Sequence, residues 1–318
     1  MVGFKDATNG SSDFSASGTG WGCSIAHHGE ILQGVFEDDN GRLHRGLVTL
    51  PLDRMKTAAV FKVVDKAVAI AMQVDKPKAY RAAELTLAYL GDPDRGGELF
   101  LESSIPVGHG YGSSTADVVA TIRAVSAGYG VKLRRSTICR LAVEAEGASD
   151  AIPYEDQAVL FAQREGNVIE HFGDALPPLL LVGFKAGDGK PVDTLNLVPA
   201  RYDSEEIQLF RVLRGLACRS IRYQDPYLLG RVATTSAIIS QRHLHKPGFK
   251  TAMKIAEAHH ACGVQVAHSG SLIGILLDGT QKGKHRLASD VAKAVGQAGF
   301  KDVGIFPINC EEADNVGP

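Results

Sequence analysis

Apolar positions along the chain repeat with two periods, one typical of strands and one typical of helices. Alternating apolar and β-branched positions predict two antiparallel strands at 46–50 and 57–64, separated by the segment Pro51-Leu-Asp-Arg54. An unbroken apolar run at 179–184 predicts a buried strand. Apolar residues three and four positions apart predict helices at 79–90, 135–146, 204–221, 226–241, 249–261 and 286–298. These elements indicate a β-rich first half with helices packed on it.

Shorter segments complete the predicted pattern. Strands are expected at 68–74, 98–105 and 302–307, and hairpins at 151–176 and 263–278. Near the N-terminus, a small-residue strand from Trp21, a turn at Gly29 and a second apolar segment are expected. Residues 1–18 are rich in Gly, Ser, Asp and Asn and predict a mobile tail, as do residues 311–318. Between the tails we expect two domains, 19–176 and 177–310, the second opened by Pro177-Pro178.

Composition narrows the class of protein. The chain has 318 residues, of which 44% are hydrophobic, so it can bury a large core. Its 34 basic and 36 acidic residues are spread evenly, which argues against a nucleic-acid partner. Five cysteines without a C-x-x-C pair favour reduced thiols. No apolar run approaches the ~20 residues of a membrane helix and no secretion signal opens the chain, so a cytoplasmic protein without a membrane partner is expected.

A glycine-rich stretch, Pro106-Val-Gly-His-Gly-Tyr-Gly-Ser-Ser-Thr-Ala116, lies between the strand at 98–105 and a further helix predicted from Ser114. Its glycines require a tight loop, and Ser113 or Ser114 is the expected N-cap of the helix. Free N–H groups at a helix N-terminus favour a bound phosphate. A flexible Gly/Ser linker is the alternative interpretation. Neither the G-x-x-x-x-G-K-[ST] loop nor the protein-kinase motif pair occurs in the chain.

The order Pro-x-x-x-Gly-x-Gly-Ser-Ser-x-Ala resembles the ATP-binding motif of the GHMP kinases, the superfamily of galactokinase, homoserine kinase, mevalonate kinase and phosphomevalonate kinase. Tyr111 stands where the family usually has Leu. The resemblance implies an α+β fold with a ribosomal-protein-like N-terminal ATP-binding half and a ferredoxin-like C-terminal half. It also implies that the ATP phosphates are bound by Pro106, Gly108, Gly110, Tyr111, Gly112, Ser113, Ser114 and Thr115.

Two other stretches resemble motifs of the same superfamily. The form Cys-x-x-x-x-x-Gly-Glu-[Ile/Leu]-[Ile/Leu]-Gln-Gly, which begins at Cys23, looks like the L-threonine kinase branch in particular. A surface hairpin is the alternative there, and a tight hairpin is the alternative for the second stretch, which looks like the C-terminal glycine-rich motif. By resemblance the acceptor is contacted by Glu30, Gln33, His268, Ser269, Gly270 and Ser271.

Carboxylates at the end of the helix at 135–146 complete the expected site. Phosphoryl transfer needs a cation held by a hydroxyl and a carboxylate, and a group that orients or deprotonates the attacking hydroxyl. The resemblance assigns Mg²⁺ to Ser114 and to either Glu144 or Glu146, and the acceptor hydroxyl to Asp150. Solvated carboxylates at a helix end are the alternative. Histidine pairs such as His27-His28 are not expected to bind metal, because no third ligand is nearby in the sequence.

The expected function is therefore transfer of the γ-phosphoryl group of ATP to a hydroxyl of a small metabolite. L-threonine is the first choice of acceptor, and serine, homoserine or a pantoate-like acid are alternatives. A catalytically silent binding protein with the same fold is a different class that stays open. ATP and Mg²⁺ are the expected cofactors, and a homodimer is a possible assembly.

Overall fold

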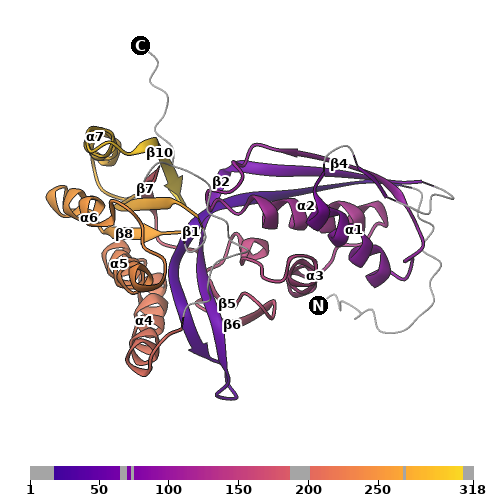
Figure 1. The fold of residues 1–318 in the computed structure, drawn as a ribbon, viewed down its shortest axis with the longest axis horizontal. Helices are drawn as coiled ribbons and strands as arrows, with labels where there is room; N and C mark the ends of the chain where they lie inside the picture. Colours follow the sequence, from indigo (N-terminus) through magenta and orange to yellow (C-terminus); the bar gives the residue numbers. More distant parts are fainter. Residues whose placement is uncertain (1–17, 65–69, 73–74, 187–200, 268–269, 311–318) are drawn as a thin grey trace, which may run out of the picture.

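The computed structural model describes residues 18–64, 70–72, 75–186, 201–267 and 270–310. They form a ten-stranded sheet with helices packed against it (Figure 1). The strand order is β10-β7-β9-β8-β1-β2-β4-β3, and the β5–β6 hairpin extends from β2. The strands are β1 Thr19–Glu37, β2 Leu43–Val63, β3 Ile70–Met72, β4 Gly97–Ser103, β5 Val159–Ala162, β6 Asn167–His171, β7 Leu179–Lys185, β8 Gly263–Val266, β9 Leu272–Asp278 and β10 Lys301–Ile308.

The helices lie close to where the apolar periodicity predicts them. They are α1 Pro77–Tyr89, α2 Ser113–Gly128, α3 Arg135–Glu146, α4 Ser204–Arg222, α5 Pro226–His243, α6 Phe249–Ala258 and α7 Lys284–Gln297, with a 3₁₀ turn at Ile152–Tyr154. The helix predicted at 249–261 ends three residues early, because the chain leaves the helical conformation at His260, whose φ is +51°. Helix α4 begins with a complete capping box between Asp203 and Glu206.

The strands predicted at 46–50 and 57–64 are one strand. β2 runs without a break through Pro51, which lies opposite His27 of β1. β1 is equally continuous, so the predicted turn at Gly29 is wrong. Together β1 and β2 form a long, bent ribbon that runs from the hairpin at the bottom of Figure 1 to the β4 side of the molecule. Of the strand predicted at 68–74, residues 70–72 form β3, and the others lie outside the described residues, as do the predicted tails except for residue 18.

The glycine at position 29 produces a bulge instead of a turn. The pairing of β1 with β2 shifts between His27 and Glu30, and Gly29 has a φ of +64°. A β-carbon at Gly29 would lie 2.5 Å from the Cα of Ala267, so close approach of the C-terminal half also requires glycine. Residues three apart in a regular strand point to opposite faces. The bulge therefore allows His27 and Glu30 to reach one site.

The two halves of the molecule meet at this bulge. Helices α1, α2 and α3 pack together beside β1, β2 and β4. Helices α5, α6 and α7 lie against the strands β7 to β10, and α4 packs against α5 and β1 (Figure 1). Within the described residues, β1 pairs with β8 through Glu30 and Val266. One hydrophobic cluster spans both halves, and further clusters lie within each half. Within the described residues, no helix combines the length and the apolar character needed to cross a membrane.

Candidate active site

The predicted phosphate loop connects β4 to α2. Gly108, Gly110 and Gly112 have φ values of +82°, +101° and +71°, which only glycine adopts readily. Helix α2 begins at Ser113 with Gly112 as its N-cap, so the prediction of a serine N-cap is wrong, and no side chain caps the helix. The first-turn N–H groups of α2 therefore remain suited to an anion at the loop.

Two residues predicted to bind phosphates are turned away from the loop. The Tyr111 side chain is buried in the core, with its ring edge-on to His28 at a centroid distance of 5.6 Å. The ring therefore cannot contact a phosphate, and the Tyr111 carbonyl accepts a hydrogen bond from the His27 backbone N–H. The Thr115 hydroxyl is buried and donates to Glu146 instead. Pro106 is exposed where the loop begins.

The structure separates the two candidate glutamates at the end of α3. Ser114 and Thr115 each donate a hydroxyl hydrogen bond to Glu146 at 2.8 Å, and Lys78 lies 3.8 Å from the same carboxylate. Only 2% of the Glu146 side chain is exposed, and burial raises the pKa of its carboxyl group to about 7. Glu144 is exposed, because two residues correspond to about 200° around a helix. Glu146 is therefore the carboxylate that faces the phosphate loop.

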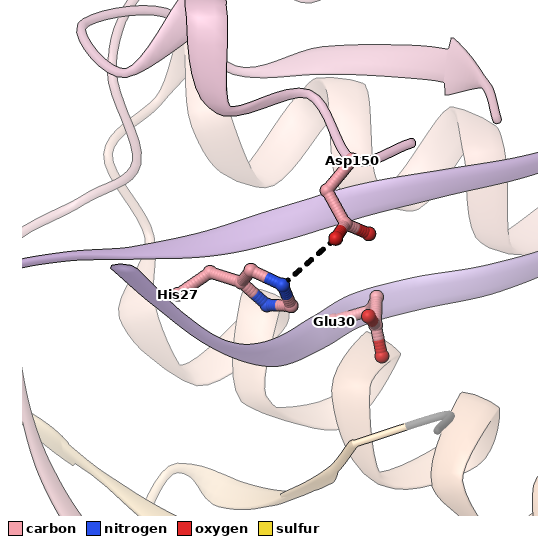
Figure 2. A group of neighbouring side chains, drawn as sticks. All are labelled: His27, Glu30 and Asp150. Carbon is pink, nitrogen blue, oxygen red and sulfur yellow. Dashed lines mark hydrogen bonds and ion pairs between the residues drawn. The ribbon is translucent and has the colours of Figure 1, made fainter. Parts of the chain in front are cut away.

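Asp150 lies beyond α3, which ends at Gly147 in the left-handed conformation. Its carboxylate accepts a hydrogen bond from His27 Nε2 at 2.9 Å and lies 3.3 Å from the Thr115 hydroxyl. Glu30 approaches from the other side of the β1 bulge, so that ligand atoms of His27, Glu30 and Asp150 lie within 4.8 Å of one another (Figure 2). His27 is absent from the predicted site, and the sequence carries no signal that would place it beside Asp150.

A second unpredicted residue approaches from the C-terminal half. Lys246 follows α5 and is only 2% exposed, and its ammonium donates a hydrogen bond to the Gly270 carbonyl. Burial lowers the pKa of Lys246 to about 8, although the charge of Glu30 acts in the opposite direction. A buried ammonium near a buried carboxylate thus faces the junction of the two halves.

The predicted C-terminal glycine-rich motif closes on the phosphate loop. The Ser271 N–H donates to the His109 carbonyl at 3.0 Å. Gly270 packs against the same backbone, where a β-carbon would clash with His109. His268 and Ser269 lie outside the described residues. The Gln33 N–H is held by the Ser236 hydroxyl at 3.0 Å, and the residue lines a small cavity together with Glu30.

Replacing Gly270 with Ala is expected to separate the two loops. Its φ is +129° and the added methyl group would overlap the backbone at His109. We expect a loss of roughly 2–3 kcal/mol in unfolding free energy and a raised KM for ATP. Gly283→Ala is the matched control, because Gly283 has a φ of +76° but open space around it, and should cost only about 1 kcal/mol. Chemical denaturation of both variants measures this, and equal losses would contradict the loop-to-loop contact.

Comparison with known proteins bears on this geometry. Residues 77–162, which contain the phosphate loop, Glu146 and Asp150, match the family described as the N-terminal domain of GHMP kinases. The chain is 29% identical over 280 residues to an L-threonine kinase of Salmonella typhimurium, covering 86% of this chain and 85% of that protein. The crystal structure of a homoserine kinase from Cytophaga hutchinsonii superposes with a TM-score of 0.69 at 18% identity, covering 98% of both chains. The chain therefore resembles the GHMP kinases along most of its length.

These similarities confirm the predicted resemblance and the α+β fold class. Like the kinases that it resembles, the chain is an ATP-dependent phosphotransferase that acts on a hydroxyl group. A homoserine kinase of Moorella thermoacetica is also similar, with 27% identity over 231 residues that cover 70% of this chain and 75% of that protein. The domain boundary at 176 and 177 stays a prediction, since strands from both sides of it join one sheet.

Proposed function

We propose that this protein transfers the γ-phosphoryl group of ATP to the hydroxyl group of L-threonine, which gives O-phospho-L-threonine. The observation that carries the proposal is the position of Thr115, whose hydroxyl lies 2.8 Å from Glu146 and 3.3 Å from Asp150. Two carboxylates, those of Glu146 and Asp150, thus lie beside the first turn of α2, next to the phosphate loop. One carboxylate suits a metal ion and the other suits the acceptor hydroxyl.

Mg²⁺ fits the donors around Glu146. Magnesium prefers oxygen ligands, and Ser114 and Glu146 supply a hydroxyl and a carboxylate whose atoms lie 2.8 Å apart. The raised pKa of Glu146 shows that its buried charge is poorly compensated by the protein alone. Ser114 and Glu146 would therefore hold the ion, which supplies positive charge for the β- and γ-phosphates.

The chain's own residues would position the reactants. The first-turn N–H groups of α2 and the loop glycines would bind the phosphates. Asp150 would orient the acceptor hydroxyl and accept its proton as the oxygen attacks the γ-phosphorus. The bond from that phosphorus to the bridging oxygen breaks, and ADP leaves with the electron pair. The Thr115 hydroxyl, between the two carboxylates, would hold them at a fixed separation.

Charges near Asp150 favour an amino acid as the acceptor. Glu30 and Lys246 are both buried, and the charge of Glu30 acts on the Lys246 ammonium, so groups of both signs lie at this end of the site. An α-amino acid offers an ammonium group to Glu30 and a carboxylate to Lys246. Among relatives that accept amino acids, two are named L-threonine kinase, at 29% and 33% identity, which supports L-threonine.

Homoserine is the second candidate, because a homoserine kinase is similar at 27% identity. Its hydroxyl lies one carbon farther from the charged groups than that of L-threonine. The same charge pair would bind both compounds, so the acceptor depends on where the hydroxyl reaches Asp150. L-serine lacks only the methyl group of L-threonine, and a missing methyl group typically changes specificity about 10- to 200-fold.

Release of ADP with Mg-ATP tests the acceptor. We expect kcat/KM for L-threonine to exceed that for L-serine about 10-fold or more. Two analogues of L-threonine probe the charge pair: 1-amino-2-propanol lacks the carboxylate, and 3-hydroxybutyrate lacks the ammonium group. Both should lose about 10²-fold or more, because each analogue lacks one of the two charged groups that the site would bind. Preference for homoserine would replace L-threonine as the acceptor, and bound ATP without turnover on any compound would favour a binding protein.

A further inference from the structure

We propose that His27 is the positioning residue for Asp150, and that its imidazolium holds the carboxylate toward the acceptor hydroxyl. The inference rests on the proposed function of this site. It adds a residue that is not among those proposed above to bind the phosphates, the metal ion or the acceptor. Its basis is the direct contact of 2.9 Å between His27 Nε2 and Asp150 Oδ2 (Figure 2).

Several contacts fix the His27 ring in place. Its side chain is 5% exposed, and its backbone N–H donates to the Tyr111 carbonyl of the phosphate loop. The ring also packs against the loop, since a β-carbon at Gly112 would clash with its Cδ2 and Nε2 atoms. The imidazole is thus held between the β1 bulge and the phosphate loop. A carboxylate bonded to it takes its position from both elements.

Two groups lie against the same oxygen of Asp150. His27 Nε2 donates to Oδ2 at 2.9 Å, and the Thr115 hydroxyl, whose proton goes to Glu146 at 2.8 Å, lies 3.3 Å from that oxygen. Asp150 lies in the loop after α3, where a side chain without such contacts would sample several rotamers. Contacts from β1 and α2 therefore select one orientation of this carboxylate, which is the property that transfer to a positioned hydroxyl requires.

The charge of His27 suits this role. Burial lowers the pKa of the imidazole, but the neighbouring charges of Asp150 and Glu30 and the hydrogen bonds to Asp150 and Gly29 outweigh burial and raise it to about 9. His28 adds a neighbouring ring that is neutral, because burial lowers its pKa to about 3. Lys246 lies beyond Glu30, and Glu146 lies beyond Asp150. His27 is therefore a cation at neutral pH.

While it is protonated, His27 acts neither as the base nor as a metal ligand. Both of these roles need a lone pair on Nε2, and that nitrogen carries the proton given to Asp150. A histidine and two carboxylates this close are otherwise a common ligand set. In the proposed reaction the acceptor proton moves to Asp150, and His27 keeps its own proton throughout. Its positive charge offsets the repulsion between Asp150 and Glu30.

Two substitutions separate the charge from the hydrogen bond. His27→Leu removes both, and we expect kcat to fall about 100-fold while KM for ATP changes less than about twofold. His27→Gln keeps a neutral donor at a similar reach and should recover part of the loss. Wild-type kcat should decline as pH rises through about 9, because the imidazolium is lost there, and His27→Gln should lack this decline.

His44→Gln is the matched control, because His44 also pairs with a carboxylate, that of Asp38 at 3.1 Å, but near the hairpin end of β1 and β2. It should leave the pH profile unchanged. A kcat within about threefold of wild type in His27→Leu would overturn the positioning role. So would a fall in kcat that is accompanied by a similar fall in ATP affinity and by a lower melting temperature, because general damage to the fold would then explain it.

An NMR titration of the histidine rings tests the same contact without turnover. His27 should titrate near pH 9, and Asp150→Asn should lower that midpoint. This readout distinguishes two failures. Absence of activity on every acceptor, with His27 still titrating near 9, refutes the proposed function and keeps the pair. A midpoint near 6.5 that does not respond to Asp150→Asn refutes the inference.

Discussion

Replacement of Asp150 with Asn should lower kcat about 10²- to 10⁴-fold and leave KM for ATP within about twofold of the wild-type value. Asn has the same shape, and its carbonyl can still accept the hydrogen bond from His27. It cannot take the proton of an attacking hydroxyl. ATP affinity should persist because Ser114 bonds to Glu146 and not to Asp150, so the substitution leaves that contact in place.

The matched control for this prediction is Asp156→Asn. Asp156 forms a two-pronged pair with Arg135 at 2.6 and 2.8 Å, but its side chain is 59% exposed. Exposed ion pairs contribute little, so the control should keep wild-type turnover. Steady-state kinetics with L-threonine and a direct measurement of ATP binding compare the two variants. Near-normal turnover in Asp150→Asn would show that this carboxylate neither deprotonates nor orients the acceptor.

Local sequence patterns were sufficient to predict most of the helices and the glycine-rich loop from Pro106. α3 has the predicted bounds, because its apolar positions and the following Gly147 specify both ends. The loop from Pro106 is recognisable because its glycines serve backbone conformations that no other residue adopts easily. Such features depend on a few adjacent residues, so a single sequence contains them.

Features that depend on distant contacts were not predictable in the same way. Gly29 and Pro51 resemble turn signals, but each lies inside a long strand whose partner accommodates it. Because the bulge at Gly29 reverses the expected alternation, the sequence could not place His27 and Glu30 together. Lys246 is far from Glu30 in sequence, and the packing of α5 and β8 against β1 brings the two halves together there.

Glu144 and Glu146 illustrate an intermediate case. Helical geometry alone requires that two residues this close in sequence face different directions. It does not say which of them faces α2, because that depends on how α3 packs. The hydroxyl contacts of Ser114 and Thr115 select Glu146. The same packing buries the Glu146 carboxylate, so its ionised form lowers the stability of the fold. The charge that would bind a metal ion is therefore the charge that destabilises the free protein.

Replacement of Glu146 with Gln should therefore have two opposite effects. Turnover with Mg-ATP should fall about 10²- to 10³-fold, because loss of a charged metal ligand removes several kcal/mol of charge stabilisation. The free protein should become more stable at pH 8. The folded-state pKa of Glu146 is raised from 4.5 to about 7, so the folded state binds this proton more tightly than the unfolded state. Stability then falls as pH rises from about 4.5 to 7, by on the order of 3 kcal/mol.

Thermal unfolding at two pH values, with and without Mg-ATP, measures the second effect. Without Mg-ATP, Glu146→Gln should unfold at a higher temperature than the wild type at pH 8, and the difference should shrink toward pH 5. With Mg-ATP, the wild type should gain stability that the variant lacks. Glu144→Gln controls for a change of charge on the same helix, and its exposed side chain should affect neither quantity. A destabilised Glu146→Gln at pH 8 that keeps its response to Mg-ATP would instead mean that this carboxylate serves the fold and not the metal.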